Sequence, residues 1–319
     1  MKSEHPDIVV IGASRGGVEA ITDVLAGLPA ELPAAVLVVQ HLNGSSLSTL
    51  PDRFAARTQL EVRHALHGDV PTPGRVYVAP PDMHILLRDG TIHVVRGPVE
   101  NGFRPAVDVL FRSAATAYGP RVIGVLLTGD GDCGTAGLVS IASRHGVVIV
   151  EDPVDATAPS MPRNALAHVR ADHIAPIAAI PGLIVAATRA PLRAWPPRER
   201  DGLEAMEGEA YGERVEIVCP LCDGALTVAR LDDFEVFRCH VGHAFSLDRL
   251  GREQHAATER ALWAAVRALE DSATSFLRLA GRGDSPSHRR FQASAEQQGA
   301  NAEAIRRILL EQPRGGGSE

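Results

Sequence analysis

The chain has 319 residues, of which 45% are hydrophobic and 22% charged, and its formal net charge is −7. This composition is ordinary for a globular protein, and the length allows one large domain with smaller appendages. The negative charge argues against a nucleic-acid-binding protein, because contact with phosphates needs a clustered excess of Lys and Arg. The N-terminal apolar run is too short for a signal peptide, and no other segment is long enough to span a membrane. We therefore expect a cytoplasmic protein without membrane insertion.

The first 190 residues alternate short apolar runs with amphipathic stretches, as an α/β sheet requires. The apolar runs are almost uninterrupted, which is typical of parallel strands covered on both faces. A hairpin is expected where Asp89 and Gly90 form a two-residue turn inside residues 84–95. The remaining expected strands are residues 8–11, 34–41, 75–80, 122–129 and 146–153, with helices at residues 17–29 and 135–146. The fold class expected for residues 1–190 is a doubly wound, mostly parallel sheet.

The composition changes after Arg189 to a stretch rich in Pro, Gly and charge, which we interpret as a linker over residues 191–213. A cysteine-rich module is expected at residues 214–250, a helical hairpin at 251–312 and a disordered tail at 313–319. Ser285 and Pro286 suit the cap and first position of the second helix of the hairpin. The hairpin is predicted from mostly apolar residues that recur at spacings of three and four. They are Leu262, Val266, Leu269, Ala273 and Phe276, then Phe291, Ala295, Ala302, Ile305 and Leu309, with the polar Gln298 in the same series.

The turn after the first strand reads GASRGG at residues 12–17 and fits G-x-S-x-G between a strand and a helix. In such a nucleophile elbow a sharp turn holds the serine hydroxyl, here that of Ser14, above the sheet. A dinucleotide-binding turn needs a glycine in place of Ser14 and an acidic residue near the end of the second strand, where the chain has Gln40 and His41. Both conditions fail. A purely structural glycine-rich turn remains the alternative.

His41 follows the second strand, at the same edge of the sheet as Ser14. A histidine in that place can act as the general base for a serine nucleophile, although a surface histidine at a strand end is the plainer interpretation. The loop TGDGDCG at residues 128–134 follows another buried strand and brings two aspartates, Asp130 and Asp132, to this edge. One of them is a candidate to orient the imidazole.

Six stretches of the first half form one pattern, namely VIGASRGGVEAI, VVQHL, GRVYVAPPDMHILL, RPAVDVLFRSAA, GVLLTGDGDCGTAGL and EDPVDATAPSMPRNAL. Together they resemble the catalytic domain of the bacterial chemotaxis methylesterase family, the CheB family. The resemblance implies hydrolysis of glutamate methyl esters on chemoreceptor helices, and often deamidation of receptor glutamines, with no cofactor in catalysis. It also implies that Ser14 is the nucleophile, His41 the base, and the backbone amides at Arg15 and Asp130 the oxyanion donors.

The chain departs from the family pattern in two ways. The family's catalytic aspartate, in a TGMGxDG pattern, aligns with Cys133, while Asp132 stands one residue early and Asp130 replaces the methionine. Loss of a triad carboxylate can cost about 10⁴ in rate, so either Asp132 substitutes for it or the enzyme is slow. We expect Asp132 to substitute. A phospho-receiver domain usually precedes this catalytic unit, whereas here the first strand begins at residue 8, so no regulation by phosphorylation in cis is expected.

Three of the four cysteines lie close together in the last third of the chain. Cys219 and Cys222 form a C-x₂-C pair, and Cys239 with His243 forms a C-x₃-H pair, separated by a stretch that predicts a β-hairpin. Such a set is typical of structural zinc, and reduced thiols fit a cytosolic protein better than disulfides. His240 is a competing ligand, but it lies next to Cys239 in the chain, which strains chelation.

The elbow and His41 thus predict a serine hydrolase, and the family resemblance implies that it acts on a methyl-accepting chemoreceptor or a similar helical substrate. A catalytically impaired family member that serves as a regulatory binding module is the alternative. The helical hairpin is a candidate for self-association, although its apolar stripe fits ordinary intramolecular packing equally well.

Overall fold

The computed structural model describes residues 4–41, 49–194, 212–231, 234–281 and 285–311. The predicted linker lies outside these residues except for 191–194 and 212–213, and the predicted tail lies wholly outside them. The chain divides into two compact units, Met1–Arg249 and Leu250–Glu319. Within the described ranges, no helix is both long enough and apolar enough to cross a membrane.

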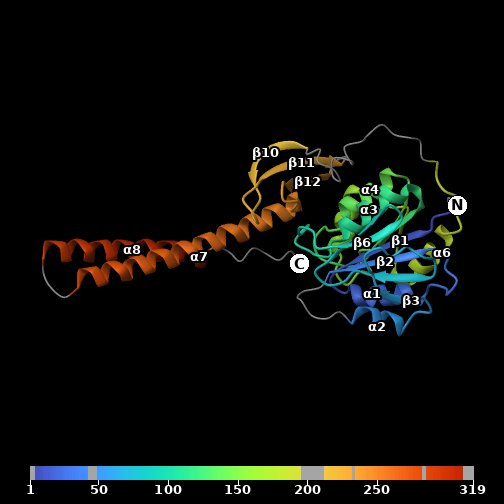
Figure 1. Cartoon of the computed structure of the whole chain (residues 1–319), viewed down its shortest axis with the longest axis horizontal. Helices are drawn as coiled ribbons and strands as arrows, with labels where there is room; N and C mark the ends of the chain where they lie inside the picture. Colours follow the sequence, from blue (N-terminus) through green and yellow to red (C-terminus); the bar gives the residue numbers. More distant parts are fainter. Residues whose placement is uncertain (1–3, 42–48, 195–211, 232–233, 282–284, 312–319) are drawn as a thin grey trace. The chain divides into compact units, whose positions relative to one another are not determined.

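The first unit is built on a seven-stranded sheet in which all neighbouring strands are parallel (Figure 1). Its order is β3-β4-β2-β1-β7-β8-β9, so the chain winds outward from β1 in both directions, as predicted. The strands are β1 Ile8–Ala13, β2 Ala35–Gln40, β3 Glu61–His64, β4 Arg75–Val78, β7 Val122–Leu126, β8 Val147–Glu151 and β9 His173–Ala175.

Helices cover both faces of this sheet, because successive side chains of a buried strand point to opposite sides. Val10 of β1 belongs to one buried cluster, whereas Val9 and Ile11 belong to the other. The cluster with Val10 is closed by α3 Val107–Tyr118, α4 Thr135–Ser143 and α5 Ser160–His168. The opposite cluster is closed by α1 Gly17–Ala26, α2 Leu50–Ala55 and α6 Ile180–Ala187.

Two antiparallel elements accompany the parallel sheet. β5 His84–Arg88 and β6 Thr91–Val95 form the predicted hairpin, and Asp89 and Gly90 both have positive φ, as a tight two-residue turn requires. The cysteine-rich module is a four-stranded antiparallel sheet of β10 Glu213–Val218, β11 Ala225–Leu231, β12 Phe234–Cys239 and β13 Ala244–Ser246. Phe234, Val236 and Ala244 of this module belong to the same buried cluster as Val10.

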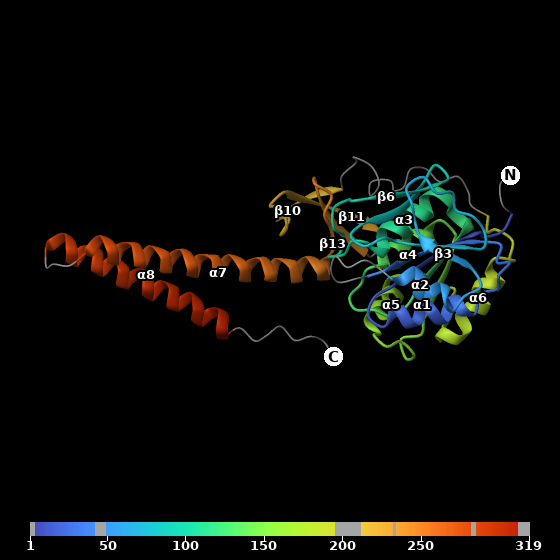
Figure 2. The same cartoon turned by 60° about the horizontal axis from the view of Figure 1, so that its bottom comes forward.

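The C-terminal hairpin consists of α7 Leu247–Ala280 and α8 Pro286–Glu311, which run side by side in opposite directions (Figures 1 and 2). The predicted seam is confirmed: Val266, Ala295 and Ala302 are buried, and the rings of Phe276 and Phe291 stack with centroids 6.3 Å apart. The predicted cap is also present, since Ser285 Oγ accepts the His288 amide at 3.2 Å.

Candidate active site

Ser14 and His41 follow neighbouring parallel strands at the carboxyl edge of the sheet. The register pairs Ala13 with Gln40, which places the next residue of each strand at the same level. The His41 amide donates to Ala13 O at 3.0 Å, and the Ser14 amide donates to Thr128 O at 2.9 Å. The loop after β7 therefore meets Ser14 on the side opposite β2, and all three predicted segments converge at one edge.

The turn that carries Ser14 leads directly into α1. Gly16 is the N-cap of this helix with φ 76°, a left-handed conformation that glycine adopts without strain. Ser14 O accepts the Gly17 amide at 2.9 Å and the Gln40 side-chain amide at 2.7 Å, which fixes the backbone of the turn. The residues after Ser14 thus present backbone N–H groups at a helix N-terminus, where negative charge is favoured.

The amides of Arg15 and Asp130 have no hydrogen-bond partner among the described residues. The amides that flank Asp130 are occupied, since Gly129 donates to Ala158 O at 2.9 Å and Gly131 donates to Ser160 Oγ at 3.0 Å. The side chains of Arg15 and Asp130 form an exposed two-point ion pair at 2.7 and 2.8 Å, which ties the two loops together. This arrangement leaves the two predicted oxyanion donors available for a ligand oxygen.

The ring of His41 is buried and stacks on Phe103, with centroids 3.6 Å apart and planes inclined by 6°. Neither Nδ1 nor Nε2 has a hydrogen-bond partner among the residues that the structure describes. Burial, with a further contribution from the charge of Arg249, lowers the pKa of His41 to about 3. The imidazole is therefore neutral, and in this conformation it is bonded to neither Ser14 nor Asp132.

Asp132 and Cys133 are both buried, in different surroundings. Asp132 lines a cavity of about 580 Å³ together with Asn164 and His168 of α5 and with Phe234 of the cysteine-rich module. Burial, reinforced by the charge of Asp108, raises the pKa of the Cys133 thiol well above its ordinary value. A protonated thiol is a weak hydrogen-bonding group and cannot replace the carboxylate of a triad.

Helix α5 fastens the loop after β7 through contacts that were not predicted. Asn164 Nδ2 donates to Gly131 O at 2.7 Å, and the Met161 amide donates to Gly129 O at 2.9 Å. Together with Ser160 Oγ these groups fix both sides of the Asp130 amide. Ser160 and Asn164 lie in one of the stretches that carry the family resemblance, which was the only signal for them in the sequence.

Glu151 lies beneath the same loop, at the end of β8. Its carboxylate accepts the Thr128 amide at 2.6 Å, and Thr128 Oγ1 donates to Arg15 O at 3.0 Å. Burial, together with the negative charge of Asp155, raises the pKa of Glu151 to about 7, although the hydrogen bond from Thr128 acts in the opposite direction. A carboxyl group that titrates near neutral pH thus contacts the backbone of the candidate site.

We predict that Glu151 makes the stability of the first unit depend on pH. The folded pKa of about 7 exceeds the ordinary glutamate pKa of 4.5, so the stabilising contribution is full below pH 4.5 and is lost as the pH rises through 7. Urea unfolding followed by circular dichroism should show wild type losing stability between pH 5 and 8 relative to Glu151→Gln. The Thr128 amide shift should titrate with the same midpoint. Parallel pH profiles for the two proteins would contradict this assignment.

The predicted metal ligands come together in the structure. Cys219 Sγ lies 3.6 Å and Cys239 Sγ 3.5 Å from His243 Nδ1, and Cys222 Sγ lies 3.6 Å from Cys239 Sγ. All four ligand atoms are within 4.8 Å of one another. Ligands of a tetrahedral zinc at about 2.1–2.3 Å are separated by about 3.5–3.8 Å, so the group has the size of a zinc site.

Two turns shape this group. The amides of Cys222 and Asp223 both point to Cys219 O, at 3.4 and 2.8 Å, and form the knuckle around the first pair. His240, the competing ligand, lies outside the group, and its ring packs against Gly224. The residues present thus fit a closed Cys₃His set.

A sequence model of the CheB methylesterase family matches residues 9–184 of the chain. A protein-glutamate methylesterase/protein-glutamine glutaminase of Methanosarcina mazei is 39% identical over 184 residues, which are 55% of this chain and 50% of the relative. A protein of the same description from Burkholderia lata is 41% identical over 175 residues, which are 54% of this chain and 48% of the relative. The chain therefore spans about half the length of these curated relatives.

The fold is similar to that of the Thermotoga maritima CheB methylesterase catalytic domain in its crystal structure, with a TM-score of 0.54 and 33% sequence identity. The similarity covers 56% of this chain and 97% of that domain. The likeness thus takes in nearly all of a known catalytic domain.

Proposed function

Since the chain belongs to the CheB methylesterase family, we propose that it hydrolyses the methyl esters of glutamate side chains on methyl-accepting chemoreceptors. The relatives are also named as glutaminases, and deamidation of glutamine by the same acyl-enzyme route is the second activity that we propose. The observation that carries the proposal is the convergence of Ser14, His41 and the available amides of Arg15 and Asp130 at one edge of the sheet.

In the proposed reaction Ser14 Oγ attacks the ester carbonyl carbon and His41 accepts the hydroxyl proton. The carbonyl oxygen becomes an oxyanion that the amides of Arg15 and Asp130 stabilise. The tetrahedral intermediate expels methanol, to which His41 returns the proton, and an acyl-enzyme remains on Ser14. A water molecule, deprotonated by His41, then releases the glutamate. Asp132 is the proposed group that orients the imidazole, and for this it must turn from the cavity toward His41.

Methanol release from a methylated receptor tests this proposal. We expect wild type to release methanol in proportion to the methyl ester supplied, and an unmethylated receptor preparation to give none. Absence of methanol release with a correctly folded enzyme would favour the second candidate, a regulatory binding module without turnover. That candidate draws support from the neutral thiol of Cys133 and from the ring of His41, which forms no hydrogen bond with the described part of the chain.

We propose that the Cys₃His set holds one structural zinc. Because all four ligands come from the protein, no position is left for a substrate, and the metal supplies folding free energy rather than chemistry. Thiolate ligands need a reducing compartment, which supports the cytoplasm as the location of the protein.

The predicted zinc content is one ion per chain by elemental analysis of protein purified without chelators. Cys219→Ser should lose the metal and unfold the module, and the damage should reach the sheet domain, because Phe234 and Val236 share its buried cluster. Limited proteolysis would measure how easily the module and the sheet domain are cleaved in this variant and in wild type. Cys133→Ser is the matched control and should keep the zinc, since Cys133 lies outside the set. A metal-free protein with an intact module would contradict this proposal.

The helical hairpin is the proposed site of self-association. Leu277, Leu279, Ile308 and Leu310 are large apolar residues that remain exposed on its two helices. Exposed apolar groups of this kind favour association with another helical surface. A monomeric mass by light scattering across the micromolar range would exclude self-association.

A further inference from the structure

The segment before α3 is held by the cysteine-rich module as well as by the sheet domain. The Asn101 amide donates to Ala244 O of β13 at 2.8 Å, and Asn101 Oδ1 accepts the Ser246 amide at 2.8 Å. Asn101 Nδ2 in turn donates to Asp108 of α3 at 3.0 Å. One residue thus links the module, its own segment and α3, and it stands two positions before Phe103.

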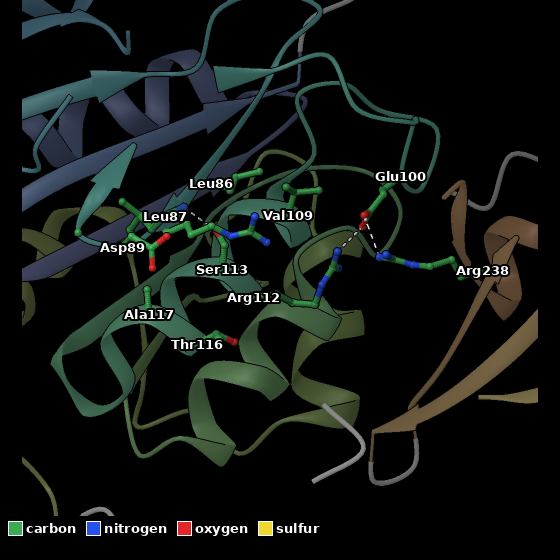
Figure 3. A pocket seen from close by; sticks show the side chains of 12 residues that line it. Leu86, Leu87, Asp89, Glu100, Val109, Arg112, Ser113, Thr116, Ala117 and Arg238 are labelled. Carbon is green, nitrogen blue, oxygen red and sulfur yellow. Dashed lines mark hydrogen bonds and ion pairs between the residues drawn. The ribbon is translucent and has the colours of Figure 1, made fainter. Parts of the chain in front are cut away.

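Glu100 makes a second link between the same parts. Its carboxylate is buried and pairs with Arg112 of α3 at 2.6 Å and with Arg238 of β12 at 3.1 Å. Figure 3 shows the guanidinium groups of Arg112 and Arg238 near each other, both directed at this carboxylate. Burial alone would raise the pKa of Glu100, but the charges of Arg112 and Arg238 hold it below its ordinary value. Removing one partner of a buried ion pair leaves an uncompensated charge, which is strongly destabilising. We therefore expect Glu100 to keep the segment, α3 and β12 firmly joined.

Phe103 belongs to the segment that these links hold, and it contacts His41, the proposed catalytic base. Its ring stacks on His41, and the guanidinium of Arg249 lies over the same ring, 5.8 Å from its centroid. Arg249 belongs to the first turn of α7, directly after β13, and its amide donates to Ser246 Oγ at 3.2 Å. Gly102 has φ 81°, a conformation that favours glycine, and a Cβ there would lie 1.9 Å from Arg249 Nη2, so a side chain at this position would displace the guanidinium.

We propose that Arg249, delivered by the cysteine-rich module, is a positioning residue of the active site that fixes Phe103 against His41 and places a permanent positive charge beside the base. This inference rests on the proposed function, in which His41 accepts the proton of Ser14. A guanidinium is attracted to the face of an aromatic ring, which accounts for the position of the Arg249 guanidinium over Phe103. The same charge opposes protonation of the imidazole, so the base stays available at acidic pH.

Arg249 is the charged group whose field lowers the pKa of His41, after the effect of burial itself. Residues 42–48, which follow His41 in the chain, include no acidic or basic side chain. Other ionisable groups on the segments around this edge include Arg15 and Asp130, paired with each other; Asp132 and Cys133 on the loop after β7, with Glu151 beneath it; and Glu100 with Arg112 and Arg238. Arg104, next to Phe103, pairs with Asp82, and Asp108 of α3 accepts hydrogen bonds from Asn101 and Gly137.

The test is the titration of the His41 ring by NMR in the full-length protein. We expect Arg249→Met to raise the midpoint by about one pH unit, while Arg249→Lys, which keeps the charge, stays close to wild type. The acid limb of the kcat/KM profile should move by the same amount as the midpoint. Arg252→Met, an exposed arginine further along α7, is the matched control and should change neither.

An unchanged His41 midpoint in Arg249→Met would overturn the proposal, and so would an equal shift in Arg249→Lys. If Arg249→Met disturbs the amide spectrum beyond its neighbours, Arg249→Gln removes the charge with a smaller change of shape and decides the matter on the same criterion. The titration needs no turnover. A shifted midpoint in a protein without esterase activity would therefore contradict the proposed function and leave the coupling between Arg249 and His41 in place.

Discussion

Ser14→Ala is expected to lower kcat for methanol release by about 10⁶, the scale of loss when a serine hydrolase is deprived of its nucleophile. The reason is geometric: Ser14 stands at the turn between β1 and α1, with the available amides of Arg15 and Asp130 on the two loops beside it. The hydroxyl is small, and its loss leaves the hydrogen bonds of the Ser14 backbone in place. Single-turnover kinetics on a methylated receptor would measure the effect.

The control for Ser14→Ala is Ser160→Ala. Ser160 also has a hydroxyl in this region, but its Oγ accepts the Gly131 amide and acts on the loop rather than on the substrate. We expect a much smaller loss for that variant. A Ser14→Ala enzyme that retains wild-type turnover would remove Ser14 from the mechanism.

Asp132→Ala is expected to lower kcat/KM by up to about 10⁴, whereas Cys133→Asp should change it little. Cys133 is a buried neutral thiol whose pKa is raised by burial and by the charge of Asp108. The same two effects would disfavour the ionised form of an aspartate at this position. Asp132 is the buried carboxylate of the loop after β7. Because neither ring nitrogen of His41 is hydrogen-bonded to any residue that the structure describes, we expect the carboxylate of Asp132 to approach the ring when substrate binds.

Steady-state kinetics of the two variants show whether position 132 or position 133 is the place of the orienting carboxylate. Glu235→Gln is the matched control, because Glu235 lines the same cavity as Asp132 without belonging to the loop. A large gain in Cys133→Asp, with little loss in Asp132→Ala, would show that the chain lacks its orienting carboxylate and is a slow enzyme.

The sheet could be predicted because its signals are local. The uninterrupted apolar runs of β1, β2, β7 and β8 mark strands buried on both faces, and parallel neighbours bring the residues after them to one edge. Asp89 and Gly90 fixed the hairpin turn, and Ser285 with Pro286 fixed the start of α8. The closeness of Cys219, Cys222, Cys239 and His243 could be predicted as well, because their short spacings in the chain keep the side chains of each pair together.

The surroundings of His41 depend on contacts between distant segments, which no local pattern records. Phe103 is an unremarkable aromatic residue in the sequence, and Arg249 is one of 32 basic residues. The ion pair of Arg15 with Asp130 joins side chains 115 positions apart. The Pro- and Gly-rich stretch after Arg189 marks a change of composition, yet composition gives no sign that Phe234 and Val236 pack into the core of the sheet domain.

Covalent labelling with a fluorophosphonate, located by tandem mass spectrometry, tests the central claim most directly. The reagent phosphonylates a serine that is activated by a neighbouring base and faces an oxyanion site. We predict a single adduct, on the peptide that contains Ser14, and none on the Ser14→Ala variant. An adduct on another residue, or no adduct on a folded protein that releases methanol, would contradict the account.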